Sequence, residues 1–183
     1  MVGTLYLRVK EGRCSSIAMK QITILVASSG SNVDLAREFE QSLAAAGVNS
    51  HTLLLDELNL PLYTAALDNS NPEIPMFTEA AQHVESATAL IVCAPEYNGS
   101  MPPVLTNFIA WLSTRTDNFR QHFNGKPVAL ATHSGGGGHN LMTSMRIQFA
   151  HLGANVLGRV AIVNSKKPIN HATIDALVQG VIQ

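Results

Sequence analysis

The sequence predicts one α/β domain in which a doubly wound, five-stranded parallel sheet is covered by helices on both faces. Three observations predict this fold class. Five short apolar runs recur along the chain, rich in β-branched or small residues, as is typical of strands buried on both faces. Each run is followed by a segment whose apolar residues recur every three or four positions, as in a helix. The length of 183 residues suits one domain, and no linker or internal repeat divides it.

The first half of the chain supplies two of the strands. A continuous apolar run predicts a strand over 22–27, and helical spacing follows within 35–46. Gly47 is expected to end that helix, because glycine readily adopts the left-handed conformation found after a helix. A second strand is expected over 51–55. The segment 56–75 is rich in Pro, Asn and Ser, and loops of this length are usually functional or contain a short helix.

The second half continues the alternation. Its strands are runs of small and β-branched residues, and its helices have apolar stripes at intervals of three and four. Proline is tolerated in the first turn of a helix, so the pair Pro102 and Pro103 indicates a helix start. The expected elements are a helix within 77–84, a strand over 89–94, a helix from Pro102 or Pro103, a strand over 127–132, a helix within 141–152, a strand over 156–163 and a helix within 174–181.

Composition excludes several classes of function. Hydrophobic residues make up 46% and charged residues 14%, so the chain is not a disordered tail. A net charge of −1 argues against a nucleic-acid binder and against a strongly acidic carrier. No apolar run approaches the ~20 residues that span a bilayer, so we expect no membrane partner. Cys14 and Cys93 lie far apart without a CxxC pattern, which favours a reducing, cytoplasmic setting.

The amino-terminal residues differ in pattern from the rest of the chain. Leu5, Leu7 and Val9 alternate with polar residues in a weak strand pattern, which is too short and too charged for a signal peptide. We therefore expect an amino-terminal extension, residues 1–19, before a domain of residues 20–183. Both a mobile arm and an added edge strand fit this pattern.

Three loops of unusual composition follow predicted strands. They are Ser28–Asn32, Pro95–Ser100 and His133–Gly138. Ligands of open parallel sheets bind outside the carboxyl ends of the strands, and these loops are expected to share that edge. The sequence therefore predicts a binding site built from the three loops.

Each loop has a functional and an ordinary interpretation. The hydroxyls and helix start at Ser28–Asn32 suit a phosphate, but Ser and Asn are also common helix caps. In Pro95–Ser100, a flat heterocycle could stack on Tyr97, although Asn-Gly alone indicates a tight turn. The glycines within His133–Gly138 allow close approach to a flat ligand, or form a flexible loop. Cys93 is interpreted as a buried small hydrophobe, and the spacing of the flanking histidines does not suit a metal.

A longer pattern identifies a family. Residues 94–102 read Ala-Pro-Glu-Tyr-Asn-Gly-Ser-Met-Pro and are followed by Leu105, Asn107, Trp111 and Ser113. This pattern resembles the signature of the NADPH-dependent FMN reductases, which include quinone, azo-dye and chromate reductases. Leu60-Pro61-Leu62-Tyr63 is similar to the family's loop after the second strand. The resemblance covers about residues 20–163.

The resemblance implies a flavodoxin-like fold with strand order 2-1-3-4-5 and bound FMN. Family members often have a longer first loop with an arginine, which this chain lacks. Commonly, members are homodimers or homotetramers. By analogy, Ser28, Ser31 and Asn32 hold the phosphate; Pro95, Glu96, Tyr97, Asn98 and Gly99 line the flavin ring; and Ser134, Gly135 and Gly136 flank its other edge.

The activity implied is hydride transfer from NADPH or NADH through FMN to a small acceptor such as a quinone, a free flavin or an azo compound. The cofactor performs this chemistry, so no catalytic side chain is predicted. Two alternatives stay open. One is a flavodoxin-type electron carrier, and the other is a flavin-free binding or regulatory domain on the same fold.

Overall fold

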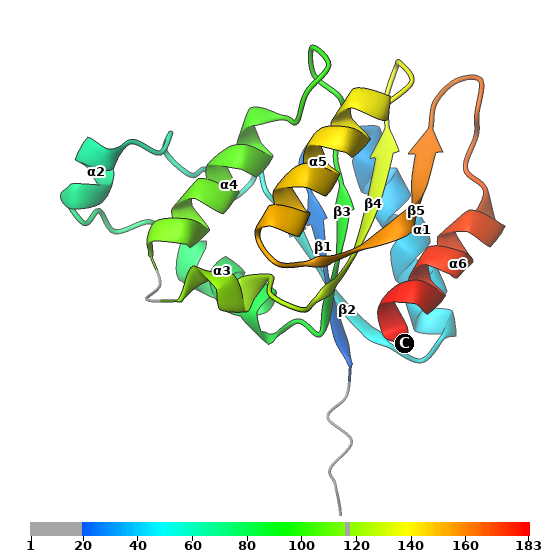
Figure 1. Ribbon diagram of the computed structural model, residues 1–183, viewed down its shortest axis with the longest axis horizontal. Coiled ribbons are helices and arrows are strands. Elements are labelled where there is room, and N and C mark those ends of the chain that lie inside the picture. The colour runs from blue at the N-terminus through cyan, green and yellow to red at the C-terminus, as the bar shows by residue number, and fades with distance from the viewer. Residues whose placement is uncertain (1–19, 116–117) are drawn as a thin grey trace, which may run out of the picture.

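The computed structural model describes residues 20–115 and 118–183, and Figure 1 shows their arrangement. The predicted extension, residues 1–19, lies outside the described residues. The elements in chain order are β1 (Gln21–Val26), α1 (Ser31–Ala45), β2 (Asn49–Leu54), α2 (Ala65–Asn69), α3 (Phe77–Ser86), β3 (Ala89–Cys93), α4 (Pro103–Thr114), the 3-10 helix η1 (Phe119–His122), β4 (Pro127–His133), α5 (His139–His151), β5 (Asn155–Val163) and α6 (His171–Ile182).

The five strands form one sheet in the order β2-β1-β3-β4-β5, and every neighbouring pair is parallel. This is the flavodoxin order, so the predicted fold class is confirmed. The order changes direction at β1, whose neighbours β2 and β3 both come later in the chain. Because all strands are parallel, their carboxyl ends lie at one edge of the sheet.

Helices cover both faces of the sheet, as predicted (Figure 1). One layer of core contains the apolar sides of α3, α4 and α5. The other contains those of α1 and α6. Successive residues of a strand point to opposite faces, so Ile24 joins the second layer while Leu25 joins the first. Both layers therefore hold the sheet rigid beneath its carboxyl edge.

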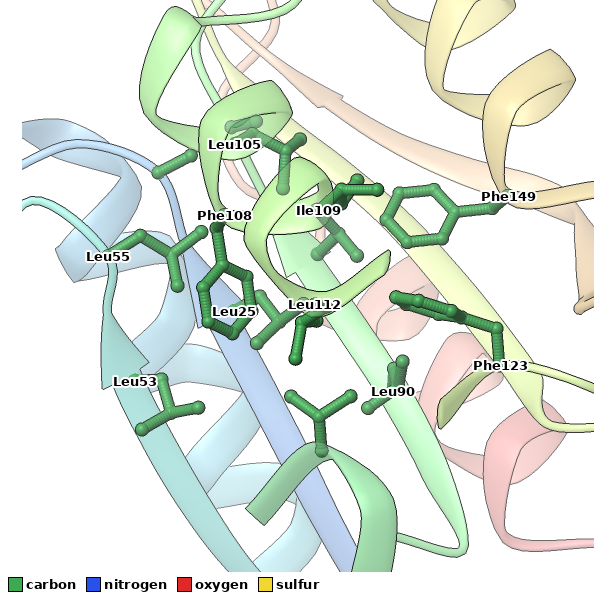
Figure 2. Packing of buried hydrophobic residues seen from close by; sticks show 14 of the residues in the cluster. Leu25, Leu53, Leu55, Leu90, Leu105, Phe108, Ile109, Leu112, Phe123 and Phe149 are labelled. Carbon is green, nitrogen blue, oxygen red and sulfur yellow. The ribbon is translucent and has the colours of Figure 1, made fainter. Parts of the chain in front are cut away.

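The layer under α4 is the more aromatic of the two. Phe108 of α4 lies beside Leu25 of β1, and Phe149 of α5 lies beside Ile109 of α4, all in the same core cluster as Leu90 of β3 (Figure 2). Phe108 and Phe149 are fully buried, and burying a side chain of this size contributes about 1.5–3 kcal/mol. This packing fixes the position of α4, whose first turn comes directly after the loop that leaves β3.

The structure adds two short helices to the predicted elements. The long segment 56–75 contains α2, capped by Thr64, whose Oγ1 accepts a hydrogen bond from the Leu67 N–H at 3.1 Å. The 3-10 helix η1 precedes β4. Both are a single turn or little more, which is too short for apolar periodicity to reveal. Within the described residues, none of the helices combines the length and apolar character needed to cross a membrane.

Candidate functional site

The three predicted loops meet at the carboxyl edge of the sheet. They leave β1, β3 and β4, which are adjacent in the sheet order. Figure 1 shows the loops after β3 and β4 standing together at one edge, with the loop after β5 beside them. Hydrogen bonds and close contacts join these loops to one another.

The β1–α1 loop opens onto the first turn of a 15-residue helix. The N-cap residue is Gly30, and no side chain caps the helix. Capping by Ser or Asn, one sequence interpretation of this loop, is therefore not what the structure shows. Ser29 and Ser31 are exposed and Ser28 is half-buried. The first amides of α1 have no partner inside the helix and lie at its positive end, an arrangement that suits an anion.

Asn32 ties this loop to the end of β4. Its side chain is 2% exposed and makes two hydrogen bonds with the backbone of His133. The His133 N–H donates to Asn32 Oδ1 at 2.8 Å, and Asn32 Nδ2 donates to the His133 carbonyl at 3.0 Å. The amide side chain therefore braces the loop, while the backbone of Asn32 remains part of the helix start.

The β3–α4 loop begins with a tight hairpin. Tyr97 and Ser100 exchange backbone hydrogen bonds of 3.1 and 3.0 Å. The two residues between them, Asn98 and Gly99, have φ values of 50° and 73°. These positive angles define a type I′ turn, for which Asn-Gly is the favoured pair. The predicted turn is thus confirmed, and it presents Tyr97, which is 50% exposed, at the edge of the sheet.

Glu96 connects the hairpin to the next loop. Its Oε2 accepts a hydrogen bond from the Leu141 N–H in the first turn of α5 at 3.2 Å. A carboxylate is favourable there because it meets the positive end of the helix. Asn140 of the same turn lies close to Gly99, where an added Cβ would be 3.4 Å from its Nδ2. The second and third loops are therefore held side by side.

The β4–α5 loop carries the glycine run. Ser134 is buried, and its Oγ accepts from the Gly136 N–H at 3.4 Å. A Cβ added at Gly135 or Gly136 would meet nothing within 4 Å, so the tip of the loop faces open space. Gly138, by contrast, has φ +68° and would place a Cβ 2.8 Å from Thr132 Cγ2. The run thus has an open tip and a tightly fitted end.

Asn107 and Trp111 of α4 hold a fourth loop, the one between β2 and α2, at this edge. Asn107 Oδ1 accepts from the Tyr63 N–H at 2.8 Å, and Asn107 Nδ2 donates to the Pro61 carbonyl at 3.0 Å. Trp111 Nε1 donates to the same carbonyl at 2.8 Å. The Tyr63 and Trp111 rings meet edge to face at 5.2 Å. The sequence singled out both segments through the family resemblance, but it gave no sign that they contact each other.

Cys93 and a cavity beside α3 are separate from the three loops. Cys93 is fully buried in β3, and burial raises the pKa of its thiol, so it is a core residue as predicted. A cavity of about 730 Å³ is lined by residues 71–78 together with Arg115 and side chains of α3. It lies around the segment between α2 and α3 and not at the strand ends.

The doubly wound sheet with strand order β2-β1-β3-β4-β5 defines a flavodoxin-like fold, in which ligands bind at the carboxyl edge of the sheet. The chain belongs to the NADPH-dependent FMN reductase family, whose sequence model matches residues 20–168. The predicted family is confirmed. The FMN and NADPH in its description are the cofactor and co-substrate that the sequence resemblance implied.

Individual relatives agree with this assignment. The chain is 29% identical over 132 residues to an NADPH azoreductase of Bacillus sp. (strain OY1-2), across 71% of this chain and 65% of that protein. It is 30% identical over 129 residues to a quinone reductase of Escherichia coli (strain K12), across 68% and 66%. The chain thus spans just under two thirds of the length of these relatives.

The fold also matches a solved structure. FerB, a flavoenzyme NAD(P)H:(acceptor) oxidoreductase from Paracoccus denitrificans, aligns with a TM-score of 0.71 at 19% identity. The alignment covers 90% of this chain and 98% of that one. At this level of identity, the likeness shows the shared fold.

Proposed function

We propose that this chain is an NAD(P)H-dependent FMN oxidoreductase that reduces a small acceptor such as a quinone, a free flavin or an azo compound. One observation carries the proposal. In a member of the FMN reductase family, the uncapped start of α1, the exposed Tyr97 hairpin and the open glycine loop lie at one edge of the sheet. These three features suit a phosphate, a ring face and a ring edge.

The residues at this edge fit FMN by the chemistry of their donors. The amides of Ser31 and Asn32, with the hydroxyls of Ser28 and Ser31, would hold the phosphate at the positive end of α1. Gly30 leaves room there, since even an added Cβ would meet nothing within 4 Å. The donors are neutral and no arginine is present in this loop, so the helix end supplies the charge complementarity.

The other two loops would hold the ring. Pro95, Glu96, Tyr97, Asn98 and Gly99 would line one side, largely through the backbone of the hairpin, because Glu96 already binds α5. Ser134, Gly135 and Gly136 would flank the other edge. When bound, FMN supplies the two-electron chemistry between NAD(P)H and the acceptor. The protein orients the ring and leaves one side accessible, and no side chain is required as an acid or base.

Flavin binding tests the site directly. The purified protein is titrated with FMN and with riboflavin, and flavin absorbance and fluorescence are followed. We expect FMN to bind more tightly than riboflavin, because only FMN has a phosphate for α1. Asn98→Ile is expected to weaken FMN binding at least about tenfold, since a β-branched residue is strained at φ 50°.

Asn71→Ile is the matched control. Asn71 has nearly the same backbone angle, φ 48°, but lies in the segment between α2 and α3. It should lose at least as much stability, because the change also removes the hydrogen bond that Asn71 Oδ1 accepts from Arg115 Nη1 at 2.6 Å, while FMN affinity is unchanged. Equal FMN affinity in Asn98→Ile and wild type would place the ring elsewhere.

The reaction separates the enzyme from an electron carrier. Rapid mixing of the FMN-loaded protein with NADPH should bleach the flavin bands, and nucleotide oxidation should continue when a benzoquinone is added. A carrier would be reduced only by a protein partner. The balance of 13 acidic and 12 basic residues favours the enzyme, because carriers of this fold usually dock through an acidic surface. A protein that takes up no flavin would support a flavin-free regulatory domain.

We also propose that the protein is a homodimer or homotetramer in a reducing, cytoplasmic compartment. Large apolar side chains are exposed on the loop after β2 and on α5, with Leu62 at 75% and Ile147 at 66%. Such residues are commonly covered at interfaces. Light scattering should give a mass of two or four chains, and Leu62→Ser should lower it. Met76→Ser is the control, because it alters another exposed apolar side chain, which lines the cavity around residues 71–78.

A further inference from the structure

The turn between β5 and α6 carries two lysines that the proposed flavin site does not use. Lys166 and Lys167 are both exposed, and they lie shortly after Val163, the last residue of β5. Because β5 is parallel to the other strands, this turn stands at the same edge of the sheet as the flavin loops (Figure 1). It lies next to the glycine loop, since β5 pairs with β4.

These lysines carry full positive charges, which the other described loops at this edge lack. Among the described residues of the loops that leave the five strands, they are the only Lys or Arg side chains. The same loops carry the acidic residues Asp56, Glu57 and Glu96. The loops compared are residues 27–30, 55–64, 94–102, 134–138 and 164–170. An anionic group arriving at this edge is therefore attracted to the β5–α6 turn.

The turn is fixed to the glycine loop by one side chain. Asn164 Oδ1 accepts from the Lys166 N–H at 3.0 Å and from the Lys167 N–H at 2.9 Å. Asn164 and Lys167 also exchange backbone hydrogen bonds of 2.9 and 3.1 Å. Asn164 Nδ2 donates to the Gly136 carbonyl at 3.2 Å. The backbone of both lysines thus has a set position relative to the loop proposed to flank the flavin ring.

Strand spacing separates this turn from the flavin phosphate. In the order β2-β1-β3-β4-β5, three spacings of about 4.8 Å lie between β1 and β5, or roughly 14 Å. The phosphate of FMN is assigned to the start of α1, after β1. The lysines instead lie beside the loop that flanks the ring, where the nucleotide that exchanges hydride with the ring must approach.

We propose that Lys166 and Lys167 bind the 2′-phosphate of NADPH and so favour NADPH over NADH. This inference rests on the proposed function, because it assigns a substrate group to the same site. A phosphomonoester carries about −1.5 to −2 charges near neutral pH, and its hydrogen bonds to ammonium groups are charge-assisted. NADH lacks this group, so the lysines act on one nucleotide and not on the other.

The first test compares the two nucleotides in the FMN-loaded double variant Lys166→Gln, Lys167→Gln. We expect kcat/KM for NADPH to fall about tenfold to a hundredfold, as the loss of charge-assisted contacts predicts, and kcat/KM for NADH to stay within about twofold. The double variant Lys166→Arg, Lys167→Arg should retain most of the NADPH preference. Arg159→Gln removes one charge from an exposed position within β5 and should leave the preference unchanged.

The second test measures binding without turnover. Calorimetry is performed with adenosine 2′,5′-bisphosphate and with adenosine 5′-monophosphate on wild type and on the double Gln variant. We expect the bisphosphate to bind wild type more tightly and the difference to disappear in the variant. The wild-type preference should also weaken as salt is raised, because exposed charges are screened.

Three results would overturn the inference. An equal fall for NADPH and NADH would show a general electrostatic effect, and unchanged discrimination would show no role. A loss of FMN affinity without a loss of riboflavin affinity would assign the lysines to the flavin phosphate. If wild type oxidises neither nucleotide yet binds the bisphosphate through these lysines, the proposed function fails while the phosphate site stands.

Discussion

The loops at the carboxyl edge of the sheet differ between their bases and their tips. At the bases, polar side chains bind backbone groups: Asn32 binds His133, Glu96 binds Leu141 and Asn107 binds residues 61 and 63. At the tips, Ser31, Tyr97 and Gly135 are exposed. Within a single loop, some residues therefore hold the shape of the site, and others are available to a ligand. Substitutions at both kinds of position test that division.

The largest effect is expected at a base. Asn32→Ala removes both hydrogen bonds to His133 and leaves its backbone groups without these partners, so the free energy of unfolding should fall by about 2–3 kcal/mol. Urea denaturation of the flavin-free protein measures this change. Ser31→Ala, at the adjacent exposed position, should change stability by no more than about 0.5 kcal/mol. If the two variants are equally stable, the base of this loop is not held by Asn32.

The glycine loop allows the same comparison over a short stretch of chain. Gly138→Ala should lower the free energy of unfolding by about 1–3 kcal/mol, because φ is +68° and the new Cβ would lie 2.8 Å from Thr132 Cγ2. Gly136→Ala has open space and is expected to leave thermal stability nearly unchanged while it reduces FMN affinity. If Gly136→Ala lost stability and Gly138→Ala lost only FMN affinity, the roles assigned to the tip and the base would be wrong.

A smaller effect is expected at the loop held by α4. Trp111→Phe keeps an aromatic ring but loses the indole hydrogen bond to the Pro61 carbonyl, so stability should fall by about 1 kcal/mol. The chain around residues 60–63 should then become more accessible to limited proteolysis. Thr106→Ala, on the same helix, is the control because Thr106 Oγ1 donates to the Pro103 carbonyl of its own helix at 2.9 Å. Similar cleavage of both variants would contradict the bracing role.

The smallest effect on stability is expected away from this edge, at His51 of β2. Its ring stacks on the ring of His83 of α3, with 3.5 Å between the ring centroids. Burial and the neighbouring His83 lower the pKa of His51, while Glu79 acts in the opposite direction. The unfolded chain therefore binds this proton more readily, and the stabilisation present above about pH 6.5 should be lost as the pH falls below it. In His51→Gln, the acid-side slope of unfolding free energy against pH should be shallower. Parallel slopes would rule out a contribution from His51.

Much of the fold could be predicted from the sequence because both faces of the central strands are buried. The strand predicted over 22–27 is Gln21–Val26, and the one over 89–94 is Ala89–Cys93. The bounds predicted for the edge strand β2, 51–55, were less accurate. It begins at Asn49, two residues before the predicted start, because Asn49 and Ser50 are exposed and carry no apolar signal. Pairing with β1 extends β2 there.

The gathering of the three loops was also predictable, since parallel strands place their carboxyl ends at one edge. The partners of individual side chains were not. Asn32 and His133 are 101 residues apart, and local pattern does not distinguish an asparagine that binds a phosphate from one that binds the backbone. Asn164 and the lysines after it were missed for a related reason, because a short polar turn has no periodicity to interpret.

The bonds between α4 and the segment 61–63 have a consequence for how the molecule assembles. Their donors and acceptors are separated by 44 to 50 positions along the chain. During synthesis, that segment emerges well before Asn107 and Trp111 exist to receive it, and contacts between distant positions form slowly. The segment therefore stays without these partners until α4 has been made, and a nascent chain stalled before residue 107 should present it to proteases and chaperones.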